Sequence, residues 1–190
     1  MQNTDSKDSQ SNLEVEVLVD RAAAGDTEAF GYLYDIYADR IYRHIYYRTS
    51  SVEDAKDLTQ DVFIEAWRAL PRYKRTKTPF LGWLFTICRH TVIDYYRTKK
   101  DHAYLSNEII VEDHGKGPEK LIEEQFAQQE VRRSILQLSE DQQQVIIMSF
   151  IEGFPYSEIA ATLNKSEGNI RVIVQRALKK MREILGKVGN

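Results

Sequence analysis

The sequence has little cysteine, no long apolar run and no surplus of positive charge. Its single cysteine among 190 residues, Cys88, cannot form a disulfide within the chain, which fits a reducing compartment. No window approaches the roughly 18 uninterrupted apolar residues of a membrane-spanning helix. Residues 1–12 are too polar for a signal peptide. We therefore expect a cytoplasmic protein without membrane insertion.

Catalytic and metal-binding patterns are also missing. The sequence contains no Gly-rich phosphate loop, nucleophile elbow or paired metal-ligand motif. Cys88 and His90 lack a second ligand pair at metal spacing, and the other histidines are scattered. We therefore expect no enzyme activity, no catalytic residues, no bound metal or cofactor and no small-molecule substrate.

The formal net charge of -3 does not by itself indicate a nucleic-acid partner, but the distribution of charge does. Residues 72–100 carry eight basic side chains against one acid, and residues 165–190 carry seven against two. Between them, residues 101–130 carry eight acids against two lysines. Two basic blocks flank an acidic one, although solvated helix faces are the more ordinary explanation of any single charge run.

The spacing of apolar residues predicts an all-α protein with two small helical domains. Residues 1–12 are polar and are expected to form a disordered tail. Apolar residues then recur at intervals of three and four over 13–100 and again over 129–188, which is typical of amphipathic helices. The acidic segment 101–128 between them lacks this period at first and is expected to be an extended linker.

The second block contains a pattern typical of a helix-turn-helix over residues 156–185. Asn164 stands between two short apolar stripes, and asparagine tolerates the left-handed conformation that such a turn needs. Small Ala160 would let the two helices approach closely, and Ser166 is placed to cap the second one. We interpret Glu167–Leu185 as a recognition helix, with an ordinary helical hairpin as the alternative.

The first turns of such a helix carry the side chains that meet DNA. The candidates for duplex DNA contacts are Ser166, Glu167, Asn169, Arg171, Val172, Gln175, Arg176 and Lys179.

The first block contains an acidic helix and a basic loop. Asp54, Asp57, Asp61 and Glu65 recur at intervals of three and four over 52–67, beside exposed-looking aromatics that favour docking on a basic helix of a partner. The alternative is a solvated acidic face above a buried aromatic core.

In the loop at 69–80, Tyr73 lies among four basic residues, a mixture suited to single-stranded DNA. His90, Asp94 and Arg97 share one polar face of the following helix, next to the loop.

Three motifs together resemble a known family. DAKDLTQDVFIEAWRALPRY, WLFTICRHTVIDYYR and the ending LSEDQQQVIIMSFIEGFPYSEIAATLNKSEGNIRVIVQRALKKMREIL resemble the second and fourth conserved regions of extracytoplasmic-function sigma factors. The resemblance implies that 13–100 binds RNA polymerase core and the minus-ten promoter element, and that 129–188 binds the minus-thirty-five element. It also implies contacts with the clamp helices of the largest polymerase subunit and the flap of the second-largest, and an anti-sigma factor as regulator.

The resemblance assigns roles to residues by position. Its core-binding positions are Asp54, Asp57, Leu58, Gln60, Asp61, Phe63 and Trp67. Its minus-ten positions are Tyr73, Lys74, Arg75, Lys77, Arg89, His90, Asp94 and Arg97. His90 stands where the family often has asparagine, and Val172 and Ile173 stand where polar and basic residues are commoner, so base preference is left open. Pro155 stands where a serine or threonine usually starts the first helix of the motif.

Two alternatives stay open at this point. The chain could be a stand-alone helix-turn-helix regulator that binds a palindromic site as a dimer, without polymerase. It could also be an adaptor that binds polymerase through the acidic helix and no longer reads promoters.

Overall fold

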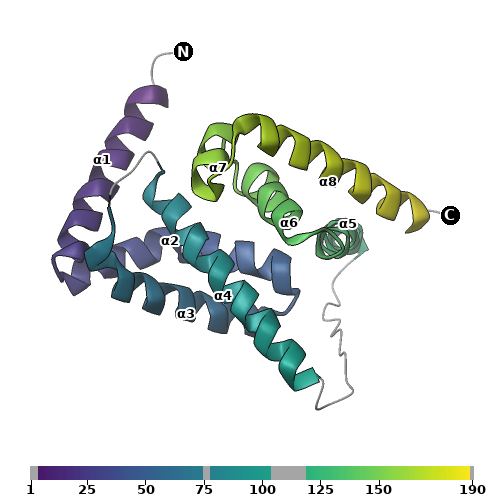
Figure 1. The fold of residues 1–190 in the computed structure, drawn as a ribbon, viewed down its shortest axis with the longest axis horizontal. Coiled ribbons are helices and arrows are strands. Elements are labelled where there is room, and N and C mark those ends of the chain that lie inside the picture. Colours follow the sequence, from purple (N-terminus) through teal and green to yellow (C-terminus); the bar gives the residue numbers. More distant parts are fainter. Residues whose placement is uncertain (1–3, 75–77, 104–118, 189–190) are drawn as a thin grey trace.

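The computed structural model describes residues 4–74, 78–103 and 119–188, and these ranges are helical apart from short turns (Figure 1). The N-terminal bundle contains α1 (Thr4–Ala23), α2 (Thr27–Thr49), α3 (Val52–Ala69), the short 3₁₀ helix η1 (Leu70–Arg72) and α4 (Phe80–Ala103). The C-terminal bundle contains α5 (Glu119–Leu136), α6 (Glu140–Ile146), the π-helical segment η2 (Ile147–Ile151), α7 (Tyr156–Leu163) and α8 (Glu167–Val188). The predicted all-α class is confirmed.

Capping residues set the bounds of α2 and α3. Asp26 accepts hydrogen bonds from the backbone N–H groups of Glu28 and Ala29, which satisfies two donors at the start of α2. The chain leaves α2 at Ser50 in the left-handed conformation, with φ of 57°. Ser51 then caps α3. The apolar stripe of α3 faces the core through Ala55, Leu58, Val62, Phe63 and Ala66.

The helix-turn-helix is formed by α7 and α8. Asn164 adopts the left-handed conformation between them, with φ of 51°, and the Ser166 hydroxyl accepts from the Asn169 backbone N–H at 3.2 Å. Pro155 precedes α7 and provides no side-chain cap. The capping box of Ser139 and Gln142 at the start of α6 is present. These local predictions are confirmed. The sequence was sufficient to make them, since each depends only on the side chains of neighbouring residues.

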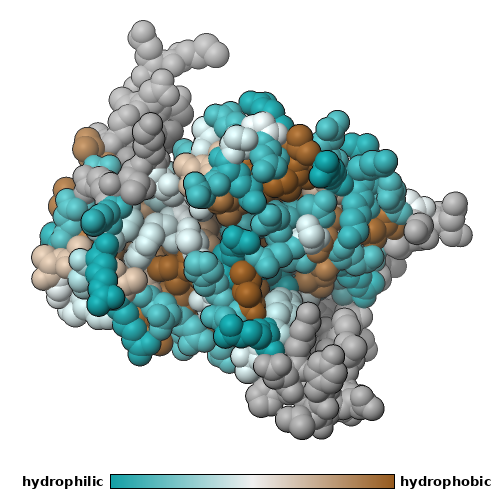
Figure 2. Space-filling view, viewed as in Figure 1, coloured by the Kyte–Doolittle hydropathy of each residue, from teal (hydrophilic) through white to brown (hydrophobic). Residues whose placement is uncertain are grey.

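The two bundles pack on each other. Helix α7 contacts α4, whereas α5 and η2 contact α2 (Figure 1). Phe85 of α4 meets Phe154, just before α7, edge to face, with ring centroids 5.5 Å apart. One apolar core therefore continues from one bundle into the other. The outer face is mostly hydrophilic in the view of Figure 2, with separate apolar patches.

The ends of two elements differ from the sequence prediction. Helix α1 begins at Thr4, so it includes most of the segment 1–12 that composition predicted to be disordered. Adding residues to an existing helix costs far less than nucleating one, and α1 is anchored by buried Val19 and Ala22.

The predicted linker 101–128 is shorter than expected, because α4 continues to Ala103 and α5 begins at Glu119. Residues 104–118 lie outside the described ranges.

Cys88 lies in the core of the N-terminal bundle with no exposed surface, and burial raises the pKa of its thiol to about 12.

Candidate functional site

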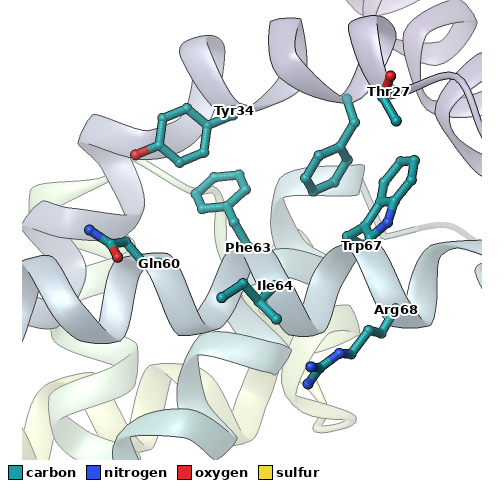
Figure 3. A pocket seen from close by; sticks show the side chains of 8 residues that line it. Thr27, Tyr34, Gln60, Phe63, Ile64, Trp67 and Arg68 are labelled. Atoms are coloured by element: carbon teal, nitrogen blue, oxygen red, sulfur yellow. The ribbon is translucent and has the colours of Figure 1, made fainter.

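An open apolar groove of about 580 Å³ lies between α2 and α3. We call it the α2–α3 groove. It is lined by Thr27, Phe30 and Tyr34 of α2 and by Gln60, Phe63, Ile64, Trp67 and Arg68 of α3. Figure 3 shows the rings of Tyr34 and Phe63 next to each other between the two helices, packed edge to face with centroids 4.7 Å apart. The rings of Phe30 and Trp67 pack against each other in a tilted arrangement, with centroids 4.9 Å apart. Aromatic contacts between the two helices therefore form the floor of the groove.

The predicted core-binding residues divide into exposed and buried members. Asp57, Gln60 and Asp61 are exposed. Leu58 and Phe63 are only 7% and 4% exposed, so Leu58 serves mainly to hold α3 in place, while Phe63 presents one edge to the groove.

Sequence reasoning missed Ile64, which is 48% exposed at the groove beside the acidic side chains. Its position one turn after Gln60 on the acidic helix was the available signal.

The Asp54 side chain forms a hydrogen bond and an ion pair within the N-terminal bundle. The Tyr95 hydroxyl donates to its carboxylate at 2.6 Å, and the Lys99 ammonium lies 3.6 Å away. Partial burial acts to raise the pKa of Asp54, but the hydrogen bonds and the charge of Lys99 outweigh it and lower the pKa below its usual value. Burial and the bond to Asp54 raise the pKa of Tyr95. Asp54 therefore ties α3 to α4 and is less available to a partner than Asp57 and Asp61.

A second, smaller pocket of about 310 Å³ lies where η1 leads into the basic loop. We call it the Tyr73 pocket. Its lining consists of Ala69, Arg72, Tyr73, Lys74, Thr78, Trp83 and Thr86 of the N-terminal bundle and Thr162 of α7. The Tyr73 ring packs against Phe80 and Trp83, with centroids 5.6 Å and 4.9 Å apart. Lys74 is exposed at the rim, whereas the predicted residues Arg75 and Lys77 lie outside the described ranges.

The polar face of α4 is only partly open. His90 is exposed, and Asp94 and Arg97 form an exposed ion pair at 3.1 Å. Arg89 instead reaches the C-terminal bundle. Its Nε donates to Glu140 at 2.8 Å and its Nη2 to Asp141 at 3.2 Å. Of the four minus-ten candidates on α4, His90, Asp94 and Arg97 are therefore exposed, and Arg89 is already ion-paired.

The recognition helix presents its predicted residues to solvent. All eight candidates from Ser166 to Lys179 are exposed. The opposite face of α8 is buried through Ile170, Val174, Ala177 and Met181. Arg171 lies 3.4 Å from Glu167 and 5.5 Å from the centre of the Tyr156 ring, so its guanidinium is held near the start of the helix.

These surfaces suit the binding of macromolecules. Among the residues that the structure describes, no group of three His, Cys, Asp or Glu side chains could hold a metal ion. None of the helices in the described ranges combines the length and apolar character that crossing a membrane requires. An exposed recognition helix with a basic face, preceded by a tight left-handed turn, defines a helix-turn-helix protein of the DNA-binding class.

Comparison with known proteins places the chain within that class. Residues 33–102 match the family model for Sigma-70 region 2, and residues 128–181 match the model for Sigma-70, region 4. The chain belongs to the sigma-70 family of RNA polymerase sigma factors, in its extracytoplasmic-function group. Sigma factors are non-catalytic transcription initiation factors.

Two curated relatives agree with this assignment, and two solved structures share the fold. The ECF RNA polymerase sigma factor BldN of Streptomyces coelicolor is 31% identical over 88% of this chain, which spans 64% of BldN. SigW of Bacillus subtilis is 29% identical over 85% of this chain and 91% of its own length.

The fold resembles CnrH, solved with the cytosolic domain of CnrY, with a TM-score of 0.70 at 24% identity over 92% of this chain and 98% of CnrH. It also resembles RpoE of Bartonella quintana, solved with the anti-sigma factor NepR, with a TM-score of 0.66 at 24% identity over 83% and 96%.

Proposed function

We propose that this protein directs RNA polymerase core to specific promoters, by recognising the minus-thirty-five element and by recognising and melting the minus-ten element. One observation carries the proposal: a single chain combines region 2 with an acidic-rimmed apolar groove and region 4 with an exposed recognition helix. Either surface alone would fit an adaptor or a stand-alone regulator. The protein would act in the cytoplasm, where the polymerase is.

Polymerase docking would use the α2–α3 groove. Its aromatic floor offers apolar area, and exposed Asp57 and Asp61 on α3 offer negative charge to a basic helix. The proposed partner surface is the clamp helices of the largest subunit, with the flap of the second-largest subunit contacting the C-terminal bundle. Apolar contact would supply affinity, and the charges would supply orientation and association rate.

Promoter reading would use two separate surfaces. Exposed Arg171, Gln175 and Arg176 on α8 are suited to base edges and phosphates of the duplex. The Tyr73 pocket would capture an unstacked base, since extruding one costs a few kcal/mol and a fitted pocket returns about 1–3 kcal/mol. These two energies are comparable. The protein would therefore melt DNA only with the help of polymerase.

An anti-sigma factor is the proposed regulator. Two proteins of the same fold, CnrH and RpoE, were solved in complex with CnrY and with the anti-sigma factor NepR. A binding protein of this kind would cover the surfaces that polymerase and promoter need.

Docking is tested by charge reversal at the groove. Asp57→Lys with Asp61→Lys should abolish co-purification with core polymerase and run-off transcription from genomic DNA of the source organism. Glu14→Lys with Glu183→Lys makes the same charge change at exposed positions on α1 and α8 and should leave co-purification intact.

Retained core binding by the Asp57 and Asp61 variant would refute the docking surface. Absence of any run-off transcript with the parent protein would refute the function. Tight binding of palindromic duplex DNA without core enzyme would instead identify a stand-alone regulator.

A further inference from the structure

Val172 is an apolar residue on the outer face of α8, where its side chain is 42% exposed. Ile170 and Val174, two residues before and two after it, are only 0% and 5% exposed. Two residues are about 200° apart around an α-helix, so Val172 points away from the bundle. It therefore faces whatever binds the outer side of the recognition helix.

The neighbours of Val172 on this face are polar. Asn169 precedes it by three residues, Gln175 and Arg176 follow it by three and four, and all three are exposed. Residues at these spacings are neighbours on a helix surface. Amide and guanidinium groups form hydrogen bonds with base edges, whereas a valine side chain forms none. A single exposed apolar residue is ordinary on a protein surface, and Val172 is distinguished by its position among groups of this kind.

Gly168 leaves an open space beside Val172. The two residues are one helical turn apart, and the side chain of a helical residue leans over the preceding turn. Apart from the surrounding helix backbone, the atom of the described residues nearest to a Cβ built at Gly168 would be Ser166 Oγ, at 4.0 Å. The fold therefore has room for alanine, which favours a helix more than glycine does. We call the open space between Gly168 and Val172 the Val172 notch.

Arg171, next to the notch, is held from within the protein. Its Nη2 lies 3.4 Å from the Glu167 carboxylate, and its guanidinium carbon lies 5.5 Å from the centre of the Tyr156 ring. A cation that is held near the start of a recognition helix attracts a phosphate or a guanine edge at a defined place. A duplex bound there would present one base pair to the Val172 notch.

We propose that the Val172 notch binds the C5-methyl group of one thymine in the minus-thirty-five element. This methyl group is the apolar group that a base pair displays in the major groove. A cytosine amino group or a guanine carbonyl placed against Val172 would lose its hydrogen bond to water and gain none, which disfavours these bases. Val172 is then a specificity-determining residue. The inference rests on the proposed function and adds the chemistry that selects one base pair.

The test removes the methyl group from the DNA and leaves its hydrogen-bonding groups unchanged. Deoxyuridine has the donors and acceptors of thymidine and lacks the C5-methyl group. Each thymine of the minus-thirty-five element, on either strand, is replaced singly by deoxyuridine in a promoter identified by run-off transcription. Competition binding then measures the Kd of each duplex for holoenzyme, which is reconstituted from core polymerase and the full chain.

Two variants change the notch and a third serves as a matched control. Val172→Ala removes the two methyl groups of the side chain, and Gly168→Ala places a Cβ in the open space. Val52→Ala makes the same change as Val172→Ala at the start of α3, where Val52 is 44% exposed. Circular dichroism checks that each variant is folded.

We expect one thymine at which loss of the methyl group weakens binding by the parent and by Val52→Ala about fourfold, the value for burial of one methyl group. With Val172→Ala and Gly168→Ala, the thymine and deoxyuridine duplexes should bind equally well at that position, because the apolar contact is lost in one variant and blocked in the other. This result supports the inference.

Three results overturn it. A promoter at which no thymine shows dependence on its methyl group has no partner for the notch. A dependence that Val172→Ala retains belongs to another residue, and one that Gly168→Ala retains lies outside the notch. Absence of any run-off transcript with the parent protein would refute the proposed function and the inference with it. Normal transcription with any of the three results removes the inference alone.

Discussion

Acidic pH should lower the stability of the folded protein through His44, which lies where the two bundles meet. This histidine lies on α2 with no exposed surface, its ring 4.6 Å from that of Phe85, and its Nε2 is 3.1 Å from the Gln144 side-chain oxygen of α6. Burial, followed by the positive charge of Arg48, lowers the pKa of His44 to about 3, and the hydrogen bond with Gln144 offsets only part of this. The imidazole is therefore neutral in the folded protein.

The direction and size of this change in stability follow from the thermodynamic linkage between proton binding and unfolding. When unfolding exposes His44, its pKa returns to about 6.5. At pH values between these two pKa values, the unfolded chain binds a proton on His44 and the folded protein does not. The stability is therefore retained above about pH 6.5 and falls as the pH decreases below it. At about pH 5 the protonation of the exposed imidazole should cost the folded state about 2 kcal/mol, since each pKa unit is worth about 1.4 kcal/mol.

Urea unfolding at about pH 7.5 and about pH 5, compared with His44→Gln, measures this contribution. The other charged and titratable groups near this site are the same in both proteins, so their effects cancel in the comparison: Arg48, Cys88, Arg89, Tyr96, Glu140 and Glu152. Between about pH 7.5 and about pH 5, the free energy of unfolding should decrease by about 2 kcal/mol more in the parent than in the variant. Equal losses would show that His44 is not the group responsible.

Three further predictions concern single side chains. Tyr73→Ala should leave core binding intact and reduce open-complex formation in permanganate footprinting; equal reactivity in mutant and parent would remove Tyr73 from base capture. Arg171→Ala should cost about 1–3 kcal/mol of promoter binding by holoenzyme and relax discrimination at one base pair, and a loss that is uniform across sequences would assign Arg171 to phosphate contact instead. Ser139→Ala should destabilise the C-terminal bundle by about 1 kcal/mol through loss of the α6 capping box, measured by thermal unfolding, with no effect on DNA specificity; an unchanged midpoint would mean that solvent satisfies these N–H groups equally well.

The local parts of the structure could be predicted because they depend on neighbouring residues. Asn164 and Ser166 specify the turn and the start of α8 through their own side chains, and the spacing of Ile170 and Ala177 identifies the buried face of that helix. The exposed positions of Asp57 and Asp61 follow from the same periodicity.

The contact between the bundles could not be predicted in this way. Glu152 and Arg40, which form an ion pair between the two bundles, are 112 residues apart in the sequence, and Glu152 stands in a short turn where a glutamate normally faces water. The same limitation applies to Arg89, whose place in a basic run suggests DNA contact and does not reveal its acidic partners on α6. A charge pattern shows that a side chain needs a counterion, but it does not show which element supplies it.

The sheltered position of Cys88 makes the protein convenient for spectroscopy. Cys88 is fully buried, and burial raises the pKa of its thiol to about 12, so it will not react with maleimide dyes at neutral pH, because only an accessible thiolate attacks them. Surface cysteines introduced one in each bundle could thus be labelled in the native chain without first replacing Cys88. Movements of the two bundles during transcription initiation could then be followed by energy transfer in an otherwise unaltered protein.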